Sequence, residues 1–248
     1  MSTIRTGSAA LGVAAAALLL TACGGQVTVD NEFLDQSPRA ITRTAFAEMS
    51  DVPSVRILGT LVSAGRRTRI DVKTDDDGGC TGSFQLERGS AQFIHNPDGT
   101  WLKADDDFWQ ATAQSPQQAR QIVAALGTSW TKAPEGTPDL RKFCDPAPML
   151  RGFKARKDGG EGRLSKGGVE LIGDTEAIAI SEKGGGQSST VWVSVSAPHR
   201  VVKLVTRDAG EPTTISFEEF GIEVGSDAPA EEDVVELSAY APKASGRK

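Results

Sequence analysis

Residues 191–206, VWVSVSAPHRVVKLVT, contain two short segments in which apolar and polar side chains alternate. The tripeptide APH at 197–199 separates them, and its proline favours a turn. Alternation with a period of two places one set of side chains on a buried sheet face and the other set in solvent or against a cavity. This stretch therefore predicts two antiparallel strands that share one apolar face.

The same pattern continues along the chain in both directions. Turn sequences such as NPDG at 96–99 separate the alternating segments, as in a β-meander. The first block of expected strands covers 54–63, 68–73, 80–88, 91–95 and 101–103, and ends with Phe108-Trp109. The second block covers 169–172, 176–182, 190–196, 201–207 and 213–220.

Helical patterns precede the first block and separate the two blocks. Ser37 followed by Pro38 is typical of a helix start, and an apolar face continues to Met49. Residues 115–126 again begin with Ser-Pro and end before a glycine, and short helices are expected around 140–143 and 148–153. The order predicts an α+β domain in which both blocks join one antiparallel sheet, with helices packed on one face.

The N-terminus has the layout of a secretory signal. One basic residue, Arg5, precedes an apolar stretch from Ala9 to Leu20, which is shorter than the roughly 20 residues that cross a membrane. The following residues, Leu20-Thr21-Ala22-Cys23-Gly24, resemble the lipobox of bacterial lipoproteins. In such proteins the cysteine receives a diacylglycerol and becomes the first residue of the mature chain. The resemblance implies a protein held on the extracytoplasmic face of the cell membrane by acyl chains, and two chains anchor stably. Ordinary signal cleavage, with Cys23 left as a thiol or in a disulfide, is the alternative.

Composition limits the function classes. The chain has 27 Lys and Arg residues against 33 Asp and Glu, a formal net charge of −6. An acidic protein gains no affinity for nucleic acid from counterion release, so we expect no nucleic-acid partner. The acidity likewise gives no attraction to anionic headgroups.

The remaining cysteines, Cys80 and Cys144, form an even pair outside the cytoplasm, which favours a disulfide. A metal site is the rival hypothesis, but with His95 and His199 as the available histidines there is no recognisable ligand spacing. Both histidines follow or precede turn sequences, and we expect them to be exposed rather than catalytic.

Two common hydrolase motifs are absent from the sequence. It contains no GxSxG or HExxH, and its glycine-rich segments lack the strand–turn–helix context of a phosphate loop. The acidic runs at 75–77 and 105–107 could hold calcium but lack its usual spacing, so solvated turns are the preferred interpretation. We expect no enzyme, no cofactor and no metal, and the sequence does not identify ligand-binding residues or a protein partner.

Taken over most of the mature length, the pattern resembles the LppX/LprG-type envelope lipoproteins and, more distantly, the LolA-like lipoprotein carriers. The resemblance lies in the lipobox, the helix at 37–49, the strand SVRILGTL that follows it, the hairpins ending in GTWLKADDDFWQ, the central helices and the second meander. It implies a curved antiparallel half-barrel whose concave face is covered by helices, with an apolar cavity for a lipid or glycolipid. The expected organisation is a signal peptide at 1–22, a tether at 23–36, a single domain at 37–240 and a disordered tail at 241–248. A structural or protein-interaction lipoprotein without a ligand is the alternative function.

Overall fold

The computed structural model describes residues 31–63, 65–133, 143–151, 163–184, 186–207 and 210–236. Its strands are β1 (Ser54–Ser63), β2 (Arg66–Asp75), β3 (Cys80–Gln85), β4 (Ser90–Asn96), β5 (Gly99–Ala104), β6 (Thr131–Lys132), β7 (Arg163–Ile172), β8 (Thr175–Gly184), β9 (Gln187–Ser194), β10 (Val201–Arg207) and β11 (Thr213–Glu218). Its α-helices are α1 (Asn31–Asp35), α2 (Pro38–Ser50), α3 (Asp106–Thr112), α4 (Pro116–Leu126) and α5 (Pro146–Arg151). None of these described helices is long and apolar enough to cross a membrane.

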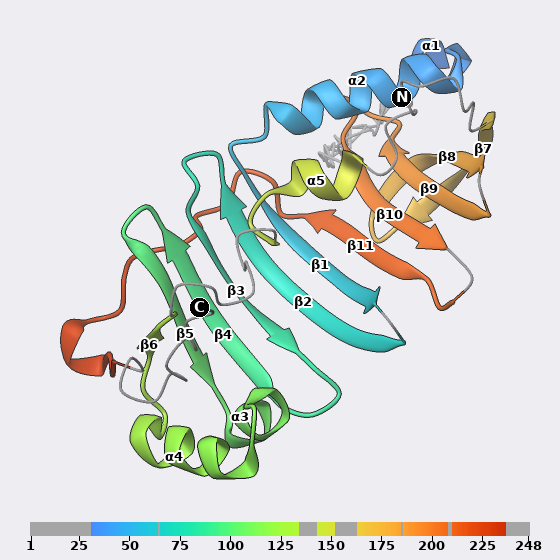
Figure 1. The fold of residues 1–248 in the computed structure, drawn as a ribbon. Coiled ribbons are helices and arrows are strands. Elements are labelled where there is room, and N and C mark those ends of the chain that lie inside the picture. The colour runs from blue at the N-terminus through green and yellow to red at the C-terminus, as the bar shows by residue number, and fades with distance from the viewer. Residues whose placement is uncertain are drawn as a thin grey trace, which may run out of the picture.

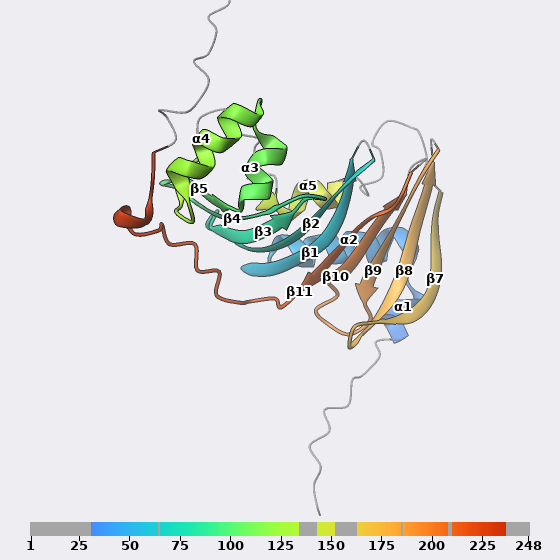
Figure 2. The ribbon, with the colours of Figure 1, turned by 90° about the horizontal axis from the view of Figure 1, so that it is seen from below.

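All the described strands belong to one open antiparallel sheet with the order β6-β5-β4-β3-β2-β1-β11-β10-β9-β8-β7. The two expected blocks meet in the middle, where Ile57 of β1 lies opposite Phe217 of β11. Figure 2 shows the sheet as a trough with α3, α4 and α5 on its inner side. The expected curved sheet with helices over its concave face is therefore confirmed.

The helices divide the trough between them. Helix α2 packs on β7, β9 and β10, whereas α3 packs on β4 and on α4 at the opposite end (Figure 1). The N-caps that the sequence predicts are present, since Ser37 accepts from the Ala40 amide and Ser115 accepts from the Gln118 amide. Apolar residues of these helices and of the inner sheet face form one continuous core.

Several local expectations differ from the structure or extend beyond its described residues. Phe108 and Trp109, expected in a strand, lie in α3, because Asp105 accepts from the Phe108 amide and caps a helix there. The last residues of the expected tether form α1, because Phe33 gains burial against the sheet. The helix expected at 140–143 lies largely outside the described residues, and α5 replaces the one expected at 148–153 as far as the description extends.

The segment after β11 crosses the ends of successive strands on one side of the sheet. The hydroxyl of Ser54 donates to the Ile222 carbonyl at 2.6 Å, and the amide of Asn96 donates to the Ser226 carbonyl at 2.9 Å. The segment then pairs with the chain beside β6, where the Val235 amide donates to the Trp130 carbonyl at 2.7 Å. This path covers the ends of the strands and leaves the inner face to the helices.

Candidate functional site

The concave face carries an uninterrupted apolar row across seven strands. The register places the following residues side by side, from β3 to β8: Phe84, Ile70, Gly59, Ile215, Leu204, Val191 and Ile180. Every side chain in the row is at most 8% exposed. With strands about 4.8 Å apart, the row is about 29 Å long, or twice the hydrocarbon depth of one membrane leaflet. Its chemistry suits an acyl chain.

Glycines on this face let the sheet bend. A Cβ on Gly59 would lie 2.7 Å from the Thr214 carbonyl oxygen, and a Cβ on Gly82 would lie 2.4 Å from the Asp71 carbonyl oxygen. Both glycines point inward, since Gly82 lies opposite Val72. Glycine inside a strand often marks a tight bend or the close approach of another backbone. At these two positions the absence of a side chain therefore lets the neighbouring strand approach closely.

Helix α5 is held against the centre of the sheet by a covalent bond. Cys80 at the start of β3 and Cys144 before α5 form a disulfide with a Cα–Cα distance of 5.5 Å. The Thr74 hydroxyl donates to the Cys144 carbonyl, and Leu150 of α5 is 4% exposed. Figure 1 shows α5 in front of the central strands. The bridge thus joins the first meander to the segment that covers the trough.

Helix α3 covers the end of the trough that lies away from α2. Asp105 accepts hydrogen bonds from the amides of Phe108 and Ser90, each at 2.8 Å. Partial burial opposes ionisation of Asp105, but these hydrogen bonds and one from the Ser90 hydroxyl outweigh it and lower its pKa. The helix buries Phe108 against Phe84 and places Trp109 in the core. The buried indole nitrogen of Trp109 has no hydrogen-bond partner among the described residues, although buried tryptophan usually finds one.

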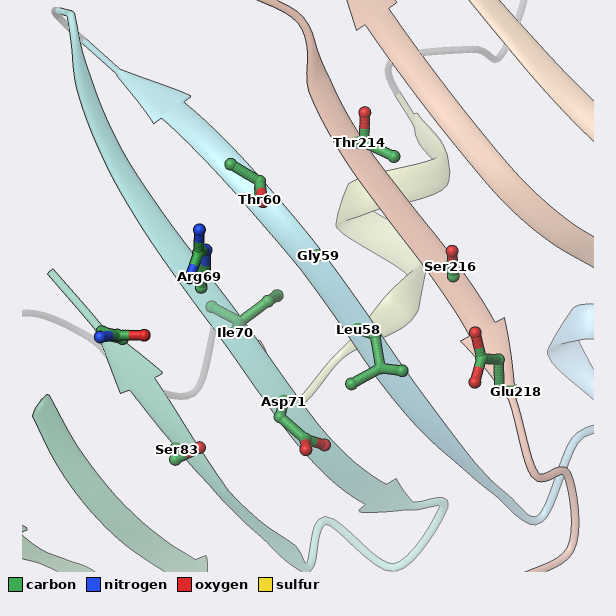
Figure 3. Close-up of a pocket in the computed structure, with 11 residues that line it drawn as sticks. Leu58, Gly59, Thr60, Arg69, Ile70, Asp71, Ser83, Thr214, Ser216 and Glu218 are labelled. Atoms are coloured by element: carbon green, nitrogen blue, oxygen red, sulfur yellow. The ribbon is translucent and has the colours of Figure 1, made fainter. Parts of the chain in front are cut away.

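The convex face is polar instead. Its groove of about 480 Å³ is lined by Leu58, Gly59, Thr60, Arg69, Ile70, Asp71, Ser83, Gln85, Thr214, Ser216 and Glu218, and Figure 3 shows hydroxyl and charged groups on these strands. Beside it, Arg56 donates to both carboxylate oxygens of Asp71 at 2.8 Å and to Glu219 at 2.6 Å. The hydrogen bond from Arg56 lowers the pKa of Asp71 and the same contact raises that of Arg56. This face offers no apolar row for an acyl chain.

The two histidines are not the exposed turn residues that the sequence predicts. His95 is half-buried in β4, with Nδ1 2.7 Å from the Thr100 hydroxyl. His199 is 9% exposed, and its ring stacks on Phe33 with centroids 3.6 Å apart. Five strand spacings, or about 24 Å, separate β4 from β10 beside His199. The two histidines therefore lie on strands well separated in the sheet order, and each has its own local partner.

The acidic runs serve turns and caps in the described structure. Asp75 accepts from the Gly79 amide at 2.6 Å inside the β2–β3 turn, and Asp105 caps α3. The described part of the chain holds no cluster of three or more histidine, cysteine or acidic side chains that could bind a metal.

The first described residues, in and after α1, lie beside β7. Lys166 Nζ donates to the carbonyls of Leu34 at 2.6 Å and Gln36 at 3.3 Å, and Phe33 packs on His199. These contacts fix α1 against the β7 end of the sheet. These hydrogen bonds from Lys166 were not predicted from the sequence, because a lysine in a strand gives no sign of a distant carbonyl partner. Cys23 lies outside the described residues.

An open, strongly curved antiparallel sheet with short helices in its trough defines an LppX- or LolA-like fold. No family model matches the chain, and no curated protein matches it. Among solved structures, LprF from Mycobacterium bovis is 15% identical with a TM-score of 0.53, covering 78% of this chain and 97% of that one. The lipoprotein LppX from Mycobacterium tuberculosis is 13% identical with a TM-score of 0.49, covering 80% and 100%.

The similarity to LprF supports the fold assignment. A lipoprotein-sorting domain from Vibrio parahaemolyticus is also similar over 79% of this chain and 97% of that one, with 11% identity and a TM-score of 0.26. At 15% identity the property shared with LprF is the fold alone, so function has to be argued from this chain's own residues.

Proposed function

We propose that this protein is a lipoprotein of the cell envelope that binds or carries an amphiphile, a lipid or glycolipid, between its sheet and helices. The observation that carries the proposal is the apolar row from Phe84 to Ile180 on the inner face of an open sheet. A close-packed domain of this size usually encloses its core between extended layers. Here short helices cover a face that spans seven strands, and one of them, α5, is attached through a disulfide.

The unpartnered indole of Trp109 supports a ligand at the α3 end of the trough. Its nitrogen is buried and has no acceptor among the described residues. A buried donor left without an acceptor costs about 1–3 kcal/mol. An ester or amide carbonyl of a bound amphiphile would accept this hydrogen bond while its acyl chain lies along the row.

The proposed attachment is the lipidated Cys23. An apolar signal segment followed by Leu-Thr-Ala-Cys is the sequence support for it. An acyl-anchored protein stays at the surface where amphiphiles leave the bilayer, which fits a carrier and needs no enzymatic group.

Lipid occupancy tests the function. The protein is purified from the membranes of its own cells, and native mass spectrometry is followed by organic extraction of the same sample. We expect a co-purifying amphiphile in stoichiometric amount, and less of it in Trp109→Phe, which keeps an aromatic ring but lacks the donor. A matched change on the convex face, Thr60→Val, should leave occupancy unchanged.

Consistently empty protein would refute the carrier proposal. If that empty protein captured one stoichiometric protein partner from solubilised membranes, the interaction lipoprotein without a ligand would be the better interpretation.

A further inference from the structure

Strand β7 exposes apolar side chains at the edge of the sheet. It is the terminal strand of the order, and no described strand pairs with its outer side. Val169 is 44% exposed and Leu171 is 67% exposed, and these are the large apolar side chains that the described structure leaves exposed. Exposed apolar groups that lie together mark a contact surface more often than isolated ones do.

The two side chains extend the apolar surface of the trough. Val169 lies opposite Ile178, which is 4% exposed, and Ile178 lies opposite Val193, which is fully buried. Leu171 projects on the same side as Val169, because they are two residues apart in a strand. An apolar path therefore leads from the free edge of β7 to the inner face.

The length of chain before α1 limits where the membrane can lie. Lys166 of β7 holds the α1 carbonyls, so the chain enters the fold beside this strand. Eight residues, 23–30, precede Asn31 in the proposed mature protein. Fully extended, they span at most about 28 Å. The β7 edge therefore stays within about one tether length of the bilayer.

The other edge of the sheet lies much farther from the anchor. Strand β6 is two residues long and stands ten strand spacings from β7, or about 48 Å along the sheet. The described residues of β6 carry no exposed large apolar side chain. We propose that the β7 edge, through Val169 and Leu171, contacts the outer surface of the membrane that anchors the protein. This inference rests on the proposed lipid anchor at Cys23.

Local features of β7 disfavour a second copy of the chain as the occupant. The register shifts between Lys166 and Val169, which leaves a bulge at Gly167 and Gly168. Bulges and inward-pointing lysines are devices that prevent edge-to-edge pairing of strands. The carboxylates of Glu170 and Glu176 lie near the apolar pair, so a membrane without net charge is the suitable probe.

Site-directed spin labelling of the full processed lipoprotein tests the contact. The protein is reconstituted into phosphatidylcholine vesicles, and sedimentation first confirms that it is bound. Nitroxides are placed in turn at Val169→Cys, Glu170→Cys and Leu171→Cys, with Gln117→Cys on exposed α4 as the control. Collision with oxygen, which is enriched in lipid, is compared with collision with an aqueous nickel reagent.

We expect the oxygen-to-nickel ratio to be several-fold higher at 169 and 171 than at 117, with a lower value at 170, which points to the convex side. Bound protein with the same aqueous ratio at all four positions would overturn the membrane contact and leave the anchor intact. Dipolar broadening at 171 without immersion would overturn it in favour of a second copy. Processed chain that fails to sediment with vesicles would overturn the anchor and this inference together.

Discussion

Removing the disulfide between Cys80 and Cys144 should be the most informative perturbation of this fold. The bond joins residues separated by 64 positions. In the chain-entropy model, a loop of that length raises the free energy of unfolding by about 4 kcal/mol. Domains are commonly stable by about 5–15 kcal/mol, so the bond would supply a large share of the total.

The double variant Cys80→Ala/Cys144→Ala can be measured by urea denaturation followed by tryptophan emission. We expect a loss of about 4 kcal/mol in the free energy of unfolding. The slope against urea should rise, because the unfolded chain becomes less compact without its cross-link. Either single variant should lose about as much as the double, since each removes the same bond, and reductant should reproduce the effect in the native sequence.

Hydrogen exchange adds a local measurement. The amides of α5 should exchange faster in the double variant, because the helix is then held by noncovalent contacts alone, among them the hydrogen bond from Thr74 and the burial of Leu150. A loss below about 1 kcal/mol together with unchanged exchange in α5 would refute the reasoning, since it would show that packing alone positions this helix.

Three further changes test local features of the fold. Asp105→Ala should lower the free energy of unfolding by about 1 kcal/mol through loss of the α3 cap. Asp71→Asn should destabilise the protein at neutral pH, and this loss should vanish in acid. The folded-state pKa of Asp71 is lowered by Arg56, so its stabilisation is present above the unfolded pKa and is lost as pH falls through the folded one. Gly59→Ala should cost about 1–3 kcal/mol, because the new methyl group meets the Thr214 backbone at 2.7 Å.

Each of these changes has a matched control in the chain. Asp105→Asn should retain most of the stability, because asparagine caps helices about as well as aspartate. Gly168→Ala places its Cβ in open space and should be nearly neutral, so an equal loss at both glycines would contradict the close-approach argument. For Asp71→Asn, chemical denaturation at neutral and acidic pH is the measurement, and an equal loss at both values would contradict the ion-pair explanation.

Periodicity was sufficient to predict most of the sheet. VWVS at 191–194 and VVKLVT at 201–206 lie in β9 and β10, with Val191, Val193 and Leu204 on the inner face. The choice of inner face could not be made from alternation alone in AIAIS, because Ala177 and Ala179 are buried on the opposite side as well. Alanine side chains are small enough to be buried by neighbouring residues on the convex face, and that burial depends on tertiary contacts.

Other features depend on contacts that no local pattern reveals. Phe108 and Trp109 are aromatic residues of the kind that favours strands, yet one side-chain cap from Asp105 starts a helix at that point. His199 follows a proline in a turn, yet it is buried because Phe33, more than 160 residues earlier, stacks on it. The hold of Lys166 on α1 is equally non-local. Pairings of this kind can be found only once the two ends of the chain are placed together.

The strand order also affects the sequence in which parts of the protein can fold. β1 pairs with β11, and α2, near the start of the chain, packs on β7, β9 and β10. A chain delivered N-terminus first can form the hairpins from β1 to β5 early, but α2 has no sheet to cover until the last third arrives. Long-range pairing of this kind slows folding. The part of the inner apolar row on β1 to β3 would remain uncovered during that interval, so the proposed amphiphile could enter before the trough is complete.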